Sequence, residues 1–263
     1  MKIKDCLILI CVLLLFLILW KILRRSEKPI RDIWVINMDT DVERWKTIET
    51  TTRHMKAFLH RWPATVGKNM QRTAAHMEGV SQMVILHTDC PPGEYYSKTN
   101  VENNAGKVGC WLSHKRLLQY LQTLSLPDNH AHLIVEDDIS FHDGFLEDWS
   151  QLSKKVPNDW DMVYLGIHKP ILNKPVDKPV YRGVTSHTDS GNWGTHAYIV
   201  KHGSIPTILS KLRFMTHEID VQYNLYFDEL KVYVIYPNIL RLHPELSMVS
   251  SIETEELAVS KTL

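Results

Sequence analysis

The sequence predicts an α/β domain with a mostly parallel sheet, preceded by one transmembrane helix. Two observations lead to this prediction. Short apolar runs suited to buried strands alternate with segments of helical periodicity after residue 31, a pattern typical of parallel strands joined by helices. Before them, the chain opens with an apolar segment at 6–23, which has the length of a membrane span.

The apolar segment at 6–23 is interrupted only by Lys21, whose ammonium can reach the membrane interface. Its 18 residues are near the lower limit for crossing a hydrocarbon core. A cleaved signal peptide is the alternative, but no small-residue cleavage site follows at 23–26. We therefore expect a signal anchor at 6–23 after a tail at 1–5. The basic residues on its two sides nearly balance, so they do not set its orientation.

After the anchor we expect a linker at 24–31, one domain at 32–250 and a flexible tail at 251–263. Hydrophobic residues make up 44% of the 263 residues, which is enough to build one core. The chain beyond residue 25 carries 25 basic and 29 acidic residues. This negative balance argues against nucleic acid as a partner, because such binding depends on basic groups that meet phosphates.

The elements of the domain follow from periodicity and turn signals. The clearest helix lies at 107–124, where Val108, Trp111, Leu112 and Leu118 recur at helical spacing. The segment 88–104 is rich in proline and asparagine and predicts a surface loop. Cys90 and Cys110 either pair or stay reduced. The remaining predicted elements are helices at 42–60 and 145–154 and strands at 33–36, 83–86, 133–135, 162–165, 197–200 and 232–236.

Three acidic residues directly follow the strand at 133–135. In an extended chain side chains alternate, so Glu136 and Asp138 point the same way and Asp137 points the other way. Two carboxylates on one side can hold Mg²⁺ or Mn²⁺, and ligands of open α/β sheets bind at the carboxyl ends of strands. The alternative is an acidic turn that faces solvent. The triplet alone also fits a phosphatase or a nuclease.

The ordered motifs of the chain resemble glycosyltransferase family 25, which contains lipooligosaccharide galactosyltransferases and collagen galactosyltransferases. The resemblance implies a Rossmann-like type A glycosyltransferase fold, that of the nucleotide-diphosphosugar transferases. It also implies a divalent ion, Mn²⁺ or Mg²⁺, and a UDP-sugar donor, most often the galactose form. The motifs that carry it are WVINMDTDVERW at 34–45, RWPATVGK at 61–68, GKVGCWLSHKRLLQ at 106–119, LIVEDDISF at 133–141, DMVYLG at 161–166 and GTHAYIVKHGS at 194–204.

The resemblance assigns roles to the residues that match the family motifs. Glu136 and Asp138 are expected to bind the metal, with His243 after the last strand as a further ligand. Asp137 belongs to the same metal and diphosphate motif. These assignments place the cation between the end of one strand and the nucleotide.

The nucleotide itself is expected at the end of the first strand, near Asn37 and Arg44. An arginine there can meet phosphate with paired donors, although a surface arginine on the first helical turn is an equal alternative. His114, in the SH pair of the long helix, either contacts the donor or a carboxylate, or is a packing residue.

The expected reaction is inverting transfer of a hexose, with galactose favoured, to a hydroxyl of a glycan or glycoprotein acceptor. Asp220 is the first candidate for the base that removes the acceptor proton, and Asp189 is the second. One alternative is a catalytically inactive, membrane-tethered binding or quality-control module on the same fold. Another is a metal-dependent phosphohydrolase. The class of enzyme suggests a single-pass type II membrane protein with its catalytic domain in the lumen of the endoplasmic reticulum or Golgi.

Overall fold

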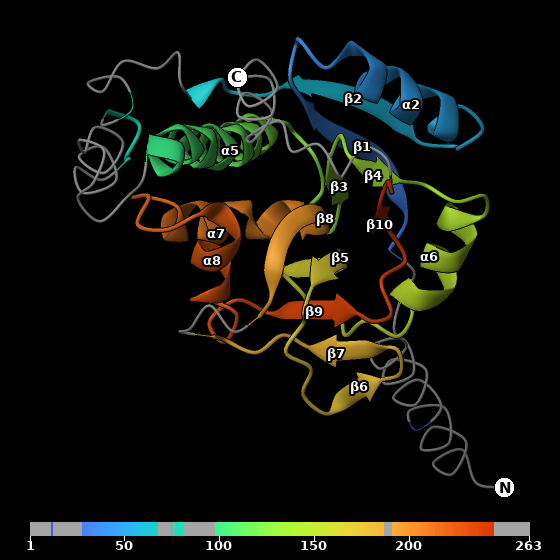
Figure 1. Ribbon diagram of the computed structural model, residues 1–263. Coiled ribbons are helices and arrows are strands. Elements are labelled where there is room, and N and C mark those ends of the chain that lie inside the picture. The colour runs from blue at the N-terminus through green and yellow to red at the C-terminus, as the bar shows by residue number, and fades with distance from the viewer. Residues whose placement is uncertain are drawn as a thin grey trace, which may run out of the picture.

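The computed structural model describes residues 12, 28–67, 75, 77–80, 98–186 and 191–244. An eight-stranded sheet runs through the described part in the order β2-β1-β3-β8-β5-β9-β7-β6 (Figure 1). A separate two-stranded sheet joins β4 to β10. The strands are β1 (Ile30–Asn37), β2 (Phe58–Pro63), β3 (Ala131–Glu136), β4 (Ile139–Ser140), β5 (Met162–His168), β6 (Pro175–Asp177), β7 (Val180–Arg182), β8 (Trp193–Lys201), β9 (Val232–Ile235) and β10 (Arg241–Leu242).

The sheet is mixed, with a core of strands that share one direction. β1 pairs in parallel with β2 and β3, and β5 pairs in parallel with β9. β8 lies between β3 and β5 and is antiparallel to both, so β2, β1, β3, β5 and β9 all run the same way. β7 and β6 extend the sheet with antiparallel pairings. The predicted α/β class is therefore confirmed, and its sheet has a Rossmann-like arrangement with one reversed strand at its centre.

Helices cover both faces of the sheet (Figure 1). Along β1, Ile33 and Val35 face one core cluster, which includes Trp149 of α6, while Trp34 and Ile36 face the other. This alternation follows from the two-residue period of a strand that is buried on both faces. The helices are α2 (Val42–Thr52) and α6 (Phe145–Ser153) on the first face and α5 (Lys98–Gln122), α7 (Ile205–Lys211) and α8 (Ile219–Asn224) on the second, with a 3₁₀ turn, η2 (His202–Ser204), before α7.

Two predicted elements differ from the structure. The helix expected at 42–60 ends at Thr52, and β2 begins at Phe58. Thr50, Thr51 and Thr52 have low helix propensity because they are β-branched and bond back to carbonyls of the preceding turn. The loop expected at 88–104 is helical from residue 98 onward, because α5 begins there. Residues 88–97 and the strand expected at 83–86 lie outside the described residues.

The predicted localisation requires correction. Within the described part of the chain, none of the helices combines the length and the apolar character needed to cross a bilayer. This finding contradicts the expectation of a single-pass type II protein in the endoplasmic reticulum or Golgi. The expected anchor at 6–23 lies outside the described residues except for Val12. The predicted boundary between linker and domain lies at 31/32, whereas β1 begins at Ile30.

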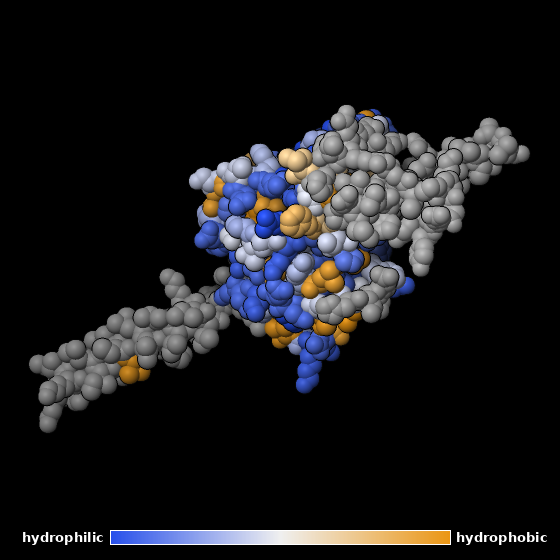
Figure 2. All heavy atoms as spheres, turned by 90° about the vertical axis from the view of Figure 1, so that its left-hand side faces the viewer, coloured by the Kyte–Doolittle hydropathy of each residue, from blue (hydrophilic) through white to orange (hydrophobic). Residues whose placement is uncertain are grey.

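The surface of the described residues is mainly hydrophilic in the view of Figure 2, with apolar residues in separate patches. Exposed large apolar side chains come from different elements, such as Phe58 of β2, Tyr120 of α5 and Val176 of β6. Scattered residues of this kind are normal for a folded domain and indicate no particular partner.

Helix α5 packs closely on the segment that follows β2. A Cβ atom at Gly109 would lie 2.5 Å from the Thr65 carbonyl oxygen and 2.8 Å from the backbone nitrogen of Gly67. One turn further, the hydroxyl of Ser113 accepts a hydrogen bond from the Thr65 N–H at 2.8 Å. The glycine in this helix is therefore required by close approach of two backbones.

We expect Gly109→Ala to destabilise the protein by about 1–3 kcal/mol, since the overpacked methyl group must displace backbone. Helix propensity alone predicts the opposite, a gain of about 1 kcal/mol. Urea unfolding measures the difference. The control is Thr50→Ala on the exposed face of α2, for which we expect a change within about 0.5 kcal/mol. Equal or greater stability of Gly109→Ala would contradict the packing.

Candidate active site

The strand pairings bring three polar positions to one edge of the sheet. Ile36 pairs with Glu136 at the carboxyl ends of β1 and β3, and Val135 pairs with Ala197 in the middle of the antiparallel β8, two residues after Thr195. Asn37 therefore comes next to the acidic triplet on one side, and Thr195 comes next to it on the other. This edge is where ligands of open α/β sheets bind.

Asp137 turns toward the first strand and is firmly held there. Its Oδ2 accepts a hydrogen bond from Asn37 Nδ2 at 2.7 Å, and its Oδ1 pairs with Arg44 Nη1 at 2.9 Å. The carboxylate is buried. Burial raises the pKa of Asp137, and the contacts with Asn37 and Arg44 offset this only in part. Arg44 thus supports a buried carboxylate and is not simply a surface residue of the first helical turn.

We expect Arg44→Ala to destabilise the protein by about 2–4 kcal/mol, because it leaves a buried carboxylate with one neutral partner. The matched control on the same helix is Lys46→Ala. Lys46 pairs with Glu43 at 2.7 Å, but both side chains are exposed, so its loss should cost less than about 1 kcal/mol. Chemical denaturation compares them. A double variant that also carries Asp137→Asn should recover part of the loss; equal costs for the two single variants would contradict this account.

Glu136 faces the second strand and the long helix. Its Oε1 accepts a hydrogen bond from the Thr195 hydroxyl at 2.7 Å and lies 3.5 Å from Nε2 of His114. His114 is buried, and its Nδ1 is 2.7 Å from the hydroxyl of Tyr198. Burial raises the pKa of the Glu136 carboxyl, but His114 and Thr195 together lower it below its ordinary value. Glu136 therefore stays ionised, whereas the pKa values of Asp137 and Asp138 are raised.

Asp138 differs from the other two acids in its hydrogen bonding. Its Oδ1 is buried and has no hydrogen-bond partner among the described residues. Burial, followed by the charges of Glu136 and Asp137, raises the pKa of Asp138 to about 7. Its backbone carbonyl accepts a hydrogen bond from the His243 N–H at 2.6 Å, which brings the segment after β10 next to the triplet.

These residues fit a divalent cation. An ionised carboxylate is an acceptor only, and a buried acceptor beside two other acids is costly unless positive charge compensates it. The orphaned Oδ1 of Asp138 is thus the kind of atom that Mg²⁺ or Mn²⁺ takes as a ligand. Glu136, whose charge acts on Asp138, is the second carboxylate of the triplet that could hold the ion.

Cys110 lies in the electrostatic field of Glu136, Asp138 and Asp220. Burial, and then the charges of Glu136, Asp220 and Asp138, raises the pKa of the Cys110 thiol well above its ordinary range. The thiol is free, and Cys90 lies outside the described residues. Ligand atoms of Cys110, His114 and Glu136 lie within 4.8 Å of one another. A thiol that keeps its proton is a poor ligand, so the carboxylate oxygens suit a divalent cation better than this group does.

Asp220, on α8, is positioned by the start of β8. Its Oδ2 accepts a hydrogen bond from the Gly194 N–H at 2.8 Å, and Gly194 precedes Thr195, the partner of Glu136. Gly194 has a φ of 86°, which favours glycine. Asp220 is half-buried. The second candidate base, Asp189, lies outside the described residues.

Three residues that contact this site were not singled out from the sequence. Arg61 of β2 donates from Nε to Asn37 Oδ1 at 2.7 Å and pairs with Asp39 at 2.9 Å. Thr195 and Tyr198 of β8 bind Glu136 and His114, respectively. The signal for Arg61 was its place in RWPATVGK, but only the parallel pairing of β2 with β1 brings it to Asn37.

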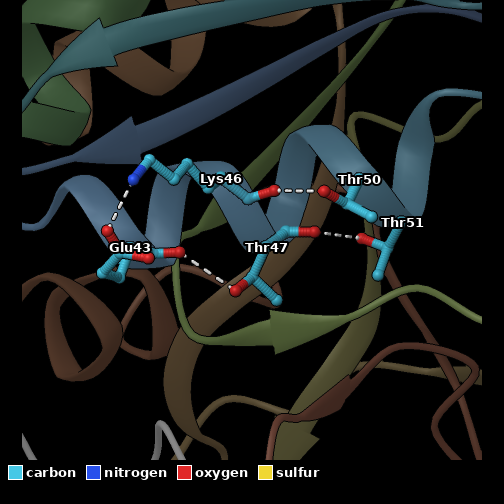
Figure 3. Close-up of a pocket in the computed structure, with 5 residues that line it drawn as sticks. All are labelled: Glu43, Lys46, Thr47, Thr50 and Thr51. Carbon is cyan, nitrogen blue, oxygen red and sulfur yellow. Dashed lines mark hydrogen bonds and ion pairs between the residues drawn. The ribbon is translucent and has the colours of Figure 1, made fainter.

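A surface depression on α2 is a weaker candidate for a binding site. Figure 3 shows Glu43, Lys46, Thr47, Thr50 and Thr51 along α2. Their polar groups bind within the helix: Lys46 meets Glu43 at 2.7 Å, and the threonine hydroxyls donate to carbonyls one turn earlier. The acids at the end of β3 remain the stronger candidate.

Comparison with known proteins agrees with the motif pattern. The model of a family described as "Glycosyltransferase family 25 (LPS biosynthesis protein)" matches residues 30–223. A Bos taurus protein described as "Probable inactive glycosyltransferase 25 family member 3" is 26% identical over 182 residues. That alignment covers 67% of this chain and 28% of the bovine protein, so this chain spans less than a third of the relative's length.

Proposed function

Because the chain belongs to glycosyltransferase family 25, we propose that it is an active, metal-dependent glycosyltransferase. It moves a hexose, galactose being the first candidate, from a UDP-sugar to a hydroxyl of a glycan or glycoprotein. The observation that carries this proposal is the buried Oδ1 of Asp138, which follows Glu136 closely in the chain and has no hydrogen-bond partner among the described residues. A bound cation would give this buried acceptor the partner that buried polar atoms normally have.

Glu136 and Asp138 would hold Mn²⁺ or Mg²⁺. His243, whose backbone N–H donates to the Asp138 carbonyl, is a further candidate ligand. A bound divalent cation supplies positive charge that offsets the negative charge of the departing diphosphate. The chain's own part is to keep the ligands oriented. Thr195 fixes Glu136, and the outer partners of metal ligands are known to matter for affinity.

The end of β1 would seat the nucleotide. Arg44 and Asn37 hold Asp137, and Arg61 holds Asn37 from the other side. These contacts make the edge of the sheet rigid before a donor arrives, and rigid placement of binding groups lowers the entropic cost of reaching the transition state. Arg61 and Arg44 also give this edge two guanidinium groups that suit phosphate.

Asp220 would act as the base. In an inverting transfer the acceptor oxygen forms a bond to the anomeric carbon, the bond from that carbon to the diphosphate oxygen breaks, and the acceptor proton moves to a carboxylate. Gly194 holds one oxygen of Asp220, and each carboxylate oxygen has a second lone pair that can accept the proton. Asp189 is the second candidate for this role.

A panel of nucleotide sugars, assayed with Mn²⁺ against glycan and peptide acceptors, tests the proposal. We expect transfer from one UDP-hexose, lost when the metal is chelated and restored when Mn²⁺ is returned. Analysis of the product's anomeric configuration tests inversion. Equal transfer in the presence of a strong chelator would contradict the metal assignment.

The second candidate function is a catalytically inactive binding module on the same fold. The bovine relative, described as a probable inactive family member, favours it. The two functions differ in one measurement. An inactive module binds UDP or UDP-sugar but neither transfers nor hydrolyses it with any donor of the panel, whereas the enzyme turns over.

A further inference from the structure

A cluster of histidines around one aspartate lies at the edge of the sheet opposite the carboxylate triplet. Asp32 is near the start of β1, and His130 and His132 are at the start of β3. His60 comes from β2, and His202 directly follows β8. The two ends meet because β8 runs antiparallel to β3, and the His202 N–H donates to the His130 carbonyl at 2.8 Å. The proposed transferase uses none of these residues.

Asp32 is the centre of the cluster. Its Oδ1 lies 2.8 Å from Nε2 of His60, and its Oδ2 lies 2.8 Å from Nε2 of His130. Ligand atoms of Asp32, His130 and His132 all lie within 4.8 Å of one another. Zinc bonds of about 2.0–2.2 Å in a tetrahedron separate neighbouring ligand atoms by roughly 3.4 Å. Small side-chain adjustments would therefore create a coordination site.

His132 provides an independent indication that a ligand belongs there. The residue is fully buried, and its Nε2 is 3.1 Å from Nδ1 of His202. Its Nδ1 is buried without a hydrogen-bond partner in the part of the chain that the structure describes. A neutral imidazole has one donor and one acceptor nitrogen, so either tautomer leaves Nδ1 unsatisfied. Buried polar atoms of this kind need an explanation.

The protonation state agrees with a metal ligand. Burial, followed by the neighbouring histidines, lowers the pKa of His132 to about 3, so the ring is neutral near pH 7. Neutral imidazole is the form that binds metals, and no proton must be displaced. The ring centroids of His130 and His132 are 4.7 Å apart, so the two imidazoles are close enough to bind one ion.

We propose that Asp32, His130 and His132 form a binding site for a divalent transition metal of the zinc class, with His60 or a water as the fourth ligand. Two imidazoles and one carboxylate suit zinc, whereas Mg²⁺ and Ca²⁺ prefer oxygen ligands alone. The metal would join β1 to β3 at the end of the sheet away from the nucleotide. Its role is to stabilise the fold.

Zinc binding by the whole chain tests this site. The protein is stripped with a chelator and titrated with Zn²⁺ by calorimetry, as wild type and as Asp32→Asn and His130→Gln. Both substitutions leave a polar side chain of similar size and remove the metal-binding carboxylate or imidazole. We expect one zinc per chain to bind this cluster in the wild type and to bind more than about 100-fold more weakly in both variants, beyond the loss expected for an outer-shell partner.

Two controls separate the cluster from other ligands. His142→Gln removes an exposed histidine that pairs with Asp148 at 3.0 Å, and Cys110→Ser removes the thiol near Glu136. Both should retain the zinc lost from Asp32→Asn. Zinc at a hundredfold excess over Kd should also raise Tm by about 5–10 °C in the wild type and both controls.

Zinc binding that does not depend on Asp32 and His130 would overturn the proposal. If Asp32→Asn and His130→Gln bind zinc as the wild type does, or if the stripped wild type binds none at this stoichiometry, the cluster is a hydrogen-bond network around Asp32. Circular dichroism of the metal-free variants shows that each is folded. If Asp32→Asn does not fold, His130→Gln still tests the proposal. The His130 side chain reaches the surface with 12% exposure, so its replacement should disturb the fold less.

Discussion

Replacing Asp138 with asparagine should abolish metal-dependent transfer and at the same time stabilise the metal-free protein. Asparagine keeps the shape but removes the charge that the cation needs, so turnover should fall by about 10³-fold or more, as for loss of a single preorganised electrostatic group. The opposite effect on stability follows from the neighbours. Burial, Glu136 and Asp137 raise the pKa of Asp138 to about 7, so its ionised form is unfavourable in the folded chain.

The sign of the pH dependence is fixed by this shift. The folded pKa lies above the unfolded value of about 3.9, so the folded state binds the extra proton and loses stability as pH rises from about 4 to 7. With a chelator present, Asp138→Asn should gain about 2–4 kcal/mol at pH 8 and almost nothing near pH 4. Urea unfolding at the two pH values measures it.

Asp143→Asn is the matched control for Asp138→Asn. The Asp143 side chain is fully exposed a few residues further along the chain, so both its turnover and its stability should stay close to those of the wild type. An Asp138→Asn protein that transfers sugar with undiminished response to Mn²⁺ would exclude Asp138 as a ligand. A loss of stability at pH 8 would show that its carboxylate has a partner in the metal-free state.

Replacing Asp220 with asparagine should lower kcat by about 10²–10⁴-fold, the range for loss of a general base. The amide oxygen can still accept the Gly194 N–H that Asp220 binds at 2.8 Å, and the variant loses only the bond from the Val221 N–H of the next residue. KM for the donor and binding of Mn²⁺ should change little, since the loss is confined to the proton transfer. Initial rates with donor and acceptor both saturating measure kcat directly.

The exposed Asp228 provides the control for this variant. Asp228→Asn should have wild-type kcat. Near-normal kcat of Asp220→Asn under saturating conditions would remove Asp220 from the mechanism and leave Asp189 as the remaining candidate base. A rise in donor KM with unchanged kcat would instead indicate that Asp220 binds the donor.

The fold class followed from local pattern, but the strand order did not. Runs such as 133–135 and 162–165 identified buried strands because every residue is apolar, and they became β3 and β5. The reversed direction of β8 depends on tertiary packing and leaves no local signal. β2 was missed because Phe58, Leu59 and His60 follow a helical segment at helix-compatible spacing, and only pairing with β1 makes them a strand.

The candidate site was predicted in its centre and missed at its margins. Glu136, Asp137 and Asp138 stood out as acids at the end of an apolar run. Their different partners could not be derived from sequence, because Arg44 lies 93 residues from Asp137 and Thr195 lies 59 residues from Glu136. The histidine cluster around Asp32 is of the same kind: its members lie in or beside four strands, β1, β2, β3 and β8, and only the sheet brings them together.

Binding of Mn²⁺ in the presence and absence of UDP tests the central claim most directly. Electron paramagnetic resonance counts free Mn²⁺ in solutions of the wild type and of Asp138→Asn. We predict one Mn²⁺ per wild-type chain, bound more tightly with UDP, and loss of this binding in Asp138→Asn. Equal Mn²⁺ binding by the two proteins, with no effect of UDP on either, would contradict a cation held by Glu136 and Asp138.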